Sequence, residues 1–165
     1  MRDMKILHLA DLHLGKRVNE ISMIEDQKYI LDQIITLIKE ENVGIVLLCG
    51  DIYDKSIPTI EAIHLLDDFL DELSKMGTKV LMISGNHDSI DRLSFGKSLF
   101  TRSNLYIASQ FEDEIEKVTV KENEMTVNFY MLPFVKPAYI NHIFQLQTES
   151  YEECFRYLIE HTKVN

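Results

Sequence analysis

The sequence predicts an α/β protein built around a parallel β-sheet. Three apolar runs with the composition of buried strands occupy residues 5–11, 44–51 and 79–86, and two stretches of helical periodicity separate them. Strands that alternate with helices in this way form parallel β-α-β units, and near-continuous apolar strands indicate a sheet covered on both faces. With 165 residues and 45% apolar content, the chain fits one domain with a substantial core.

The two connecting segments are predicted helices, each with one apolar face. The first carries apolar residues at helical spacing, at Ile30, Leu31, Ile34, Ile35 and Ile38. The second does so at Ile63, Leu66, Phe69, Leu70 and Leu73. We expect both faces to pack against the sheet.

The C-terminal half continues the alternation less regularly. After the third strand we expect a short helix over about residues 91–101 and a strand in "LYIAS" (105–109). Apolar and polar residues alternate on both sides of Glu122 and Asn123, which predicts an antiparallel hairpin. Ser150 and Glu153 have the spacing of a capping box, so a helix should follow and run to about Thr162.

Composition narrows the class of protein. The formal net charge of −10 argues against unaided, nonspecific binding to a polyanion, although a metal-dependent enzyme can bind phosphate through its ions. No apolar stretch approaches the roughly 20 residues that cross a bilayer, and no signal-peptide pattern opens the chain, so we expect a cytoplasmic protein without membrane contact.

Cys49 and Cys154 are expected to be buried, reduced thiols. A solvated face is expected for the acidic cluster, Glu112, Asp113, Glu114 and Glu116.

Polar side chains follow all three predicted strands at the point where each ends. They are Asp11 and His13, then Asp51 and Asp54, then Asn86 and His87. Because the carboxyl ends of parallel strands meet along one edge of a sheet, these side chains should lie close together. Nearby glycines permit the sharp turns that such loops need, at Gly15, Gly50 and Gly85.

The donor set fits a pair of divalent cations. Carboxylate and amide oxygens mixed with imidazole nitrogens suit Mn²⁺, Fe²⁺ or Zn²⁺. One carboxylate can bridge two ions about 3.5–4 Å apart, an arrangement that clamps the attacking and leaving oxygens of a phosphoryl displacement. The sequence therefore predicts a two-metal phosphoesterase site at this edge.

The motifs D-x-H, G-D-x-x-D and G-N-H-D, in this order, resemble the first three motifs of the calcineurin-like metallophosphoesterases. Within that superfamily, "ILHLADLHLG", "LCGDIYD", "SGNHDS" and "LPFVKP" resemble the SbcD nucleases, the nuclease subunits of the bacterial SbcCD DNA exonuclease. The resemblance runs from Met4 to about Pro137. It implies a calcineurin-like α/β sandwich, of which this chain is the N-terminal portion, and a metal-dependent DNA nuclease of repair and recombination.

The resemblance also implies roles for single residues. Asp11 and His13 match ligands of a first metal, Asp51 the bridging ligand and Asn86 a ligand of the second, with Mn²⁺ as the expected ion. His87 matches the catalytic histidine, which stabilises the transition state or protonates the leaving oxygen.

Three neighbouring positions are interpreted from their chemistry. Asp54 is placed to orient His87, as a third group commonly does for an acid or base. Asp88 is expected to fix its turn by local hydrogen bonds and not to bind metal. Lys16 and Arg17, just past the first motif, are candidates for contact with a phosphate backbone.

The family completes its metal site with three later histidines, in A-H-x and G-H-x-H motifs, and the sequence reaches Asn165 without them. We therefore expect the N-terminal portion of a longer phosphoesterase domain, weakly active or inactive alone. The other histidines are expected to be structural or solvated: His8, His64, His142 and His161. The partners implied by resemblance are DNA, an SbcC-like ATPase bound through regions absent from this chain, and a second copy of the chain.

Two alternatives remain open. The same three motifs occur in phosphoesterases that act on cyclic nucleotides or small phosphomonoesters. The chain could also be a non-catalytic dimerisation module, with residues 92–102 as its surface or as a contact for DNA. The plainer interpretation of that segment is an amphipathic helix that covers the sheet, with apolar Leu93, Phe95, Leu99 and Phe100.

Overall fold

A four-stranded parallel sheet forms the centre of the protein, as the sequence predicts. The computed structural model describes residues 4–122 and 124–163. The strands lie in the order β1-β4-β5-β6 and span Ile6–Leu9, Ile45–Cys49, Lys79–Ile83 and Leu105–Ala108. The first three end before the polar motifs, so the motifs lie in the loops that follow the strands. A small hairpin, β2 (Arg17–Val18) and β3 (Ile21–Ser22), follows the first motif.

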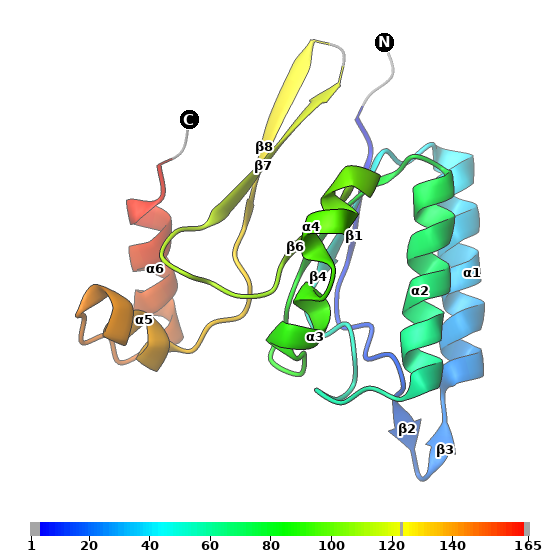
Figure 1. Cartoon of the computed structure of the whole chain (residues 1–165), viewed down its shortest axis with the longest axis horizontal. Helices are drawn as coiled ribbons and strands as arrows, with labels where there is room; N and C mark the ends of the chain where they lie inside the picture. Colours follow the sequence, from blue (N-terminus) through cyan, green and yellow to red (C-terminus); the bar gives the residue numbers. More distant parts are fainter. Residues whose placement is uncertain (1–3, 123, 164–165) are drawn as a thin grey trace.

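Two long helices cover one face of the sheet (Figure 1). They are α1 (Ile24–Glu41) and α2 (Ile60–Lys75), and their buried residues share one core with Val46, Leu48, Val80 and Met82. Ile30 and Ile63 do not join this core, since they are 54% and 41% exposed. Each lies at the margin of its apolar stripe, and the sheet contacts only the centre of the stripe. The buried positions are Leu31, Ile35 and Ile38 on α1 and Ala62, Leu65, Leu66, Phe69 and Leu73 on α2.

An antiparallel hairpin covers the opposite face, so the prediction of a sheet covered on both sides is confirmed. Strands β7 (Glu116–Glu122) and β8 (Met125–Met131) pair along their whole length. Of the two residues predicted for the turn, Glu122 ends β7, and Asn123 lies outside the described residues. One apolar cluster joins the two layers, Ile45, Leu81 and Ala108 from the sheet with Val118, Val120 and Met131 from the hairpin.

The prediction of a single helix over residues 91–101 is wrong. The structure has two short helices there, α3 (Ile90–Ser94) and α4 (Lys97–Phe100), followed by a 3₁₀ turn at Thr101–Ser103. The break falls at Phe95, whose ψ of 122° is not helical, and Gly96, whose φ of +76° lies in the left-handed region. Glycine adopts that region without steric cost, so the chain turns here and only Leu93 of α3 reaches the core.

The C-terminal segment forms two further helices, α5 (Pro137–Phe144) and α6 (Tyr151–His161). The predicted N-cap is confirmed, because the Ser150 hydroxyl accepts from the backbone nitrogen of Glu153 at 3.2 Å. The two helices pack around Phe111, Ile140, Cys154 and Leu158. Both cysteines are free thiols, Cys154 fully and Cys49 half buried, and burial raises the pKa of each. Within the described residues, none of the helices combines the length and apolarity that crossing a membrane requires.

Candidate phosphoesterase site at the strand ends

The loops after β1 and β4 run side by side and extend the sheet's pairing. The backbone nitrogens of Asp11 and His13 donate to the carbonyls of Gly50 and Asp51, at 3.2 and 2.9 Å. Leu14, one residue on, donates to the Ile52 carbonyl at 2.9 Å. The first two motifs are thus held in register with each other by main-chain bonds.

Three of the predicted ligand residues have left-handed backbones. Their φ values are 57° at Asp11, 44° at His13 and 49° at Asp51. A residue other than glycine in this region costs about 1–3 kcal/mol, and such residues persist only where surrounding contacts impose the conformation. Functional sites commonly contain them. Three residues that carry the predicted chemistry are therefore held in a strained conformation.

His13 lies at the centre of a group of carboxylates. Its Nε2 is 3.8 Å from Asp11 Oδ1 and 3.8 Å from Asp51 Oδ2, and its Nδ1 is 3.7 Å from Asp54 Oδ1. These distances exceed those of hydrogen bonds. Two ligands bound at about 2.1 Å to one ion lie roughly 3–3.5 Å apart, so small adjustments would let Asp11, His13 and Asp51 share a cation. Among the described residues, no hydrogen-bond partner reaches the buried His13 Nδ1.

His87 enters the same group from the loop after β5. Its backbone nitrogen donates to Asp51 Oδ1 at 3.0 Å, and its imidazole lies edge-on to that of His13, with ring centroids 4.9 Å apart. Its Nδ1 lies 2.9 Å from the backbone carbonyl of Asp54. A carbonyl only accepts, so Nδ1 carries a proton and Nε2 remains for other contacts. Ligand atoms of His13, Asp51 and His87 all lie within 4.8 Å of one another.

Asn86 is exposed on this loop, between two residues that contact Asp51. On one side is His87, through the backbone bond described above. On the other is Gly85, where a Cβ would lie 2.0 Å from Asp51 Oδ1. The backbone that carries Asn86 therefore lies directly against the Asp51 carboxylate.

Asp88 joins the loop after β5 to the loop after β4. Its carboxylate accepts from the backbone nitrogens of Gly85 at 2.8 Å, Ile52 at 3.1 Å and Tyr53 at 3.0 Å. The expected local hydrogen bond is present, and two further bonds reach across to the second motif. Burial, with a smaller contribution from the Asp88 charge, raises the pKa of Tyr53 to about 12, so its phenol stays protonated.

Comparison with known proteins identifies the family. A family model described as calcineurin-like phosphoesterase matches residues 4–160. The chain belongs to the calcineurin-like phosphoesterases. Membership of this family implies binding of divalent metal.

Two curated relatives are named as the SbcD component of the nuclease SbcCD. The protein of Staphylococcus saprophyticus is 42% identical over 132 residues, which cover 79% of this chain and 34% of the relative. That of Staphylococcus epidermidis is 37% identical over 171 residues, covering 98% of this chain and 45% of the relative. The chain thus spans less than half the length of these relatives.

In this calcineurin-like phosphoesterase, Asp54 does not contact His87 through its carboxylate. The contact uses the Asp54 backbone carbonyl, while the carboxylate faces His13. Lys16 is exposed beside the first motif. Arg17 lies on β2, where its guanidinium donates to the Glu20 carbonyl and pairs with the Glu20 carboxylate at 3.9 Å. Its head group is therefore engaged within the β2–β3 hairpin.

The sequence interpretation missed Gln27. Its side chain contacts the backbone of the first motif at Leu12, His13 and Gly15. A single glutamine in the first turns of a helix carries no motif, and nothing in its spacing indicates which loop it will meet.

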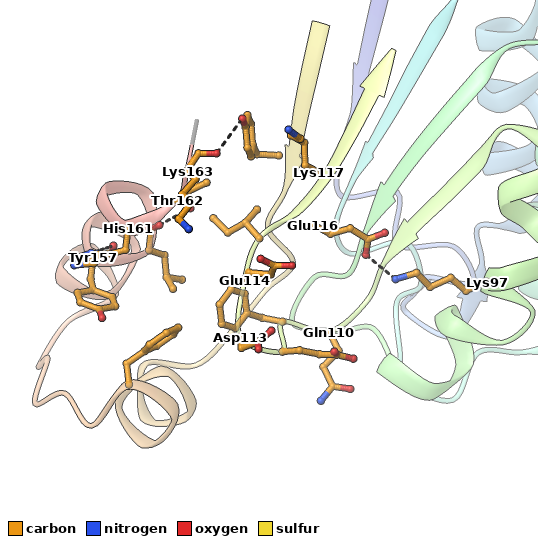
Figure 2. Close-up of a pocket in the computed structure, with 16 residues that line it drawn as sticks. Lys97, Gln110, Asp113, Glu114, Glu116, Lys117, Tyr157, His161, Thr162 and Lys163 are labelled. Atoms are coloured by element: carbon orange, nitrogen blue, oxygen red, sulfur yellow. Dashed lines mark hydrogen bonds and ion pairs between the residues drawn. The ribbon is translucent and has the colours of Figure 1, made fainter. Parts of the chain in front are cut away.

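A cavity of about 690 Å³ lies apart from the phosphoesterase site, between the base of the β7–β8 hairpin and α6 (Figure 2). Its described lining includes no residue of the three strand-end loops. The acidic cluster borders it. Glu112, Asp113 and Glu114 are exposed there, as a solvated face requires, whereas Glu116 is half buried and pairs with Lys97 at 2.7 Å.

The remaining histidines lie outside the site. His8 is on β1, His64 on α2 and His142 on α5. His161, at the end of α6, stacks on Tyr157 with ring centroids 4.0 Å apart.

Proposed function

We propose that this chain is the N-terminal, metal-binding part of a DNA nuclease of SbcD type, which hydrolyses phosphodiester bonds in DNA repair and recombination. One observation carries the proposal: the imidazole of His13 lies between the Asp11 and Asp51 carboxylates, and the backbone nitrogen of His87 donates to the Asp51 carboxylate. The relatives named as components of the SbcCD nuclease support the substrate class. Residues 1–165 would belong to a single phosphoesterase domain, in keeping with the continuous family match over 4–160.

The metal ligands we propose are Asp11 and His13 for one ion, Asp51 shared between two, and Asn86 for the second. The spacing of the Asp11 and Asp51 carboxylates around His13 Nε2 supports a cation there, and the mixture of nitrogen and oxygen donors suits Mn²⁺. When bound, such a pair of ions neutralises phosphate charge and lowers the pKa of bound water.

His87 is the proposed general acid or transition-state stabiliser. The Asp54 carbonyl occupies its Nδ1, so Nε2 is the ring nitrogen left to contact a phosphate or leaving oxygen. The His87 ring is exposed, so a substrate phosphate can reach it. Asp54 is then a positioning residue with two functions, its carbonyl holding His87 and its carboxylate facing His13. Lys16 and Arg17 lie where a phosphate backbone could pass, and Arg17 would have to leave Glu20 to bind it.

The metal site is tested by titrating the chain with Mn²⁺ by calorimetry, beside Asp51→Asn. Asparagine keeps the shape of Asp51 but removes the charge that two ions would share, so Mn²⁺ affinity should fall at least tenfold. The matched control is Asp113→Asn, an exposed carboxylate at the separate cavity, which should bind as the parent does. Equal affinities for Asp51→Asn and the parent would place the ion elsewhere.

The substrate is tested with linear duplex DNA and a small phosphodiester in Mn²⁺, using this chain and the chain extended to the length of its relatives. Faster hydrolysis of DNA is expected, at least in the longer chain. Preference for the small ester would support the alternative of a cyclic-nucleotide or small-phosphoester enzyme. We also propose that the protein acts in the cytoplasm, away from membranes, where its DNA substrate would lie, with an SbcC-like ATPase bound through regions outside residues 1–165.

We further propose that the protein forms a homodimer through α3 and α4. Phe95 and Leu99 are 83% and 65% exposed, which is unusual for large apolar side chains on neighbouring turns. Phe95→Glu would place a charge in the interface, so the dimer measured by sedimentation should become a monomer. Ile159→Glu, on α6, is the control, since Ile159 is 63% exposed on another helix. A monomeric parent would contradict the dimer and leave this surface free.

A further inference from the structure

The side chain of Gln27 binds the backbone of the loop that carries Asp11 and His13. Its Nε2 donates to the carbonyls of Leu12 at 3.1 Å and His13 at 2.8 Å, and its Oε1 accepts from the nitrogen of Gly15 at 3.0 Å. Two carbonyls and one N–H require two donors and one acceptor, and a primary amide supplies both. The amide orientation is therefore set by its partners.

Gln27 is itself held in place by α1. It lies in the first turns of that helix, where its backbone nitrogen donates to the Met23 carbonyl at 2.8 Å, and its side chain is half buried. Met23 in turn donates to the Lys16 carbonyl at 3.0 Å. The start of α1 is thus bonded to the loop at two places, through Met23 at Lys16 and through Gln27 at residues 12–15.

The loop needs such support because His13 has a left-handed backbone, with a φ of 44°. Histidine in that conformation relaxes toward negative φ unless neighbouring contacts prevent it. The His13 carbonyl accepts from Gln27 and from the Lys16 nitrogen at 3.1 Å, while its nitrogen donates to the Asp51 carbonyl. Of these contacts, only the one from Gln27 comes from a side chain.

We propose that Gln27 is a positioning residue, whose amide holds residues 12–15 so that the His13 imidazole stays between the Asp11 and Asp51 carboxylates. The proposal rests on the metal site proposed above. Groups that orient metal ligands from outside typically change metal affinity by about 10–100-fold when removed. Such groups usually contact the ring nitrogen of a histidine ligand that does not bind the metal, whereas Gln27 contacts the backbone of His13.

Two substitutions separate the donors from the acceptor. Gln27→Ala removes all three bonds, whereas Gln27→Glu keeps the length and the oxygen that accepts from Gly15 but places a carboxylate oxygen against two carbonyls. Gln33→Ala and Gln33→Glu are the controls, since Gln33 is exposed on the same helix. Should Gln27→Ala fail to fold, the isosteric Gln27→Glu still decides.

The first measurement is by NMR without metal. The Cα chemical shift of His13 reports its backbone conformation, and we expect it to move from the left-handed value in both Gln27 variants and in neither Gln33 variant. The Gly15 amide should lose protection from hydrogen exchange in Gln27→Ala but keep it in Gln27→Glu. An unchanged His13 shift in both Gln27 variants would overturn the proposal.

The second measurement is Mn²⁺ affinity by calorimetry, which should fall at least tenfold in both Gln27 variants. If the His13 shift moves while Mn²⁺ affinity stays within twofold of the parent, the conformation of residues 12–15 does not determine metal affinity, and the proposal is overturned. If the parent binds no Mn²⁺, the metal site proposed for this chain fails. The His13 shift alone then decides whether Gln27 positions the loop.

Discussion

Gly85→Ala should lower the free energy of unfolding by about 3 kcal/mol and abolish Mn²⁺ binding, since overpacking of a filled site costs about 1–3 kcal/mol or more. A Cβ at this position would lie 2.0 Å from Asp51 Oδ1 and 2.2 Å from the Asp51 nitrogen. The backbones of Gly50 and Gly85 also lie close together, since a Cβ added at Gly50 would lie 3.1 Å from the Gly85 Cα. Either the β4 loop or the β5 loop must move, and both carry proposed ligands.

Urea unfolding followed by circular dichroism measures this loss, as the chain has no tryptophan for fluorescence. Gly77→Ala is the matched control: Gly77 has a φ of +70° and no atom within 4 Å of an added Cβ. It should therefore show only the conformational cost of a left-handed alanine, about 1–2 kcal/mol, with Mn²⁺ binding intact. A Gly85→Ala protein as stable as Gly77→Ala would mean that the two loops are looser than the structure indicates.

The sequence alone was sufficient for the parallel sheet, because each of its first three strands is an apolar run followed by a polar motif. Strand ends in a parallel sheet lie at one edge, so the proximity of His13, Asp51 and His87 required no further information. The hairpin was also predictable, since its inward residues alternate with polar ones. What covers the second face of the sheet was not, because both helices and hairpins can fill it.

Two predictions of the fold were wrong because the packing of neighbouring layers decided the outcome and the spacing of apolar residues did not. The segment around Gly96 has helical spacing of apolar residues, yet the chain turns at that glycine and leaves Phe95 exposed. Ile30 fits the apolar stripe of α1 by periodicity but lies beyond the width of the sheet contact. Periodicity gives the direction of a side chain and says nothing of how far the neighbouring layer extends.

Within the site, the contacts that span loops were the least predictable. Asp54 was expected to orient His87, and it contacts His87 through a carbonyl that every residue has, while its carboxylate faces His13. Gln27 meets the first motif from a different element. Such contacts depend on the relative placement of helix and loop, which is a property of the folded core. The candidate ligands are readable from the sequence, and so is the local bond of Asp88, whereas the contacts that reach from one element to another are not.

Asp88→Ala should destabilise the protein by about 3 kcal/mol and weaken Mn²⁺ binding at least tenfold, because three backbone N–H groups lose a charged acceptor. Those groups belong to Gly85 on one loop and to Ile52 and Tyr53 on the other. Asp88 therefore joins the loop of Asp51 to the loop of His87 by three bonds, beside the contacts that His87 makes with Asp51 and Asp54. Without it, the left-handed backbone of Asp51, with a φ of 49°, loses support on its C-terminal side.

Asp88→Asn sharpens the test, because its single carbonyl oxygen can replace Oδ2, which accepts from Gly85 and Ile52, but not Oδ1, which accepts from Tyr53. We expect a loss of about 1 kcal/mol, the value of one net hydrogen bond. Asp91→Ala, at an exposed acidic position in the first turn of α3, should change neither stability nor Mn²⁺ affinity appreciably. If stability and Mn²⁺ affinity both decrease from the parent to Asp88→Asn and again to Asp88→Ala, Asp88 acts through the hydrogen bonds that its oxygens accept. Equal losses for Asn and Ala would show that its negative charge, and not the number of its bonds, holds the two loops together.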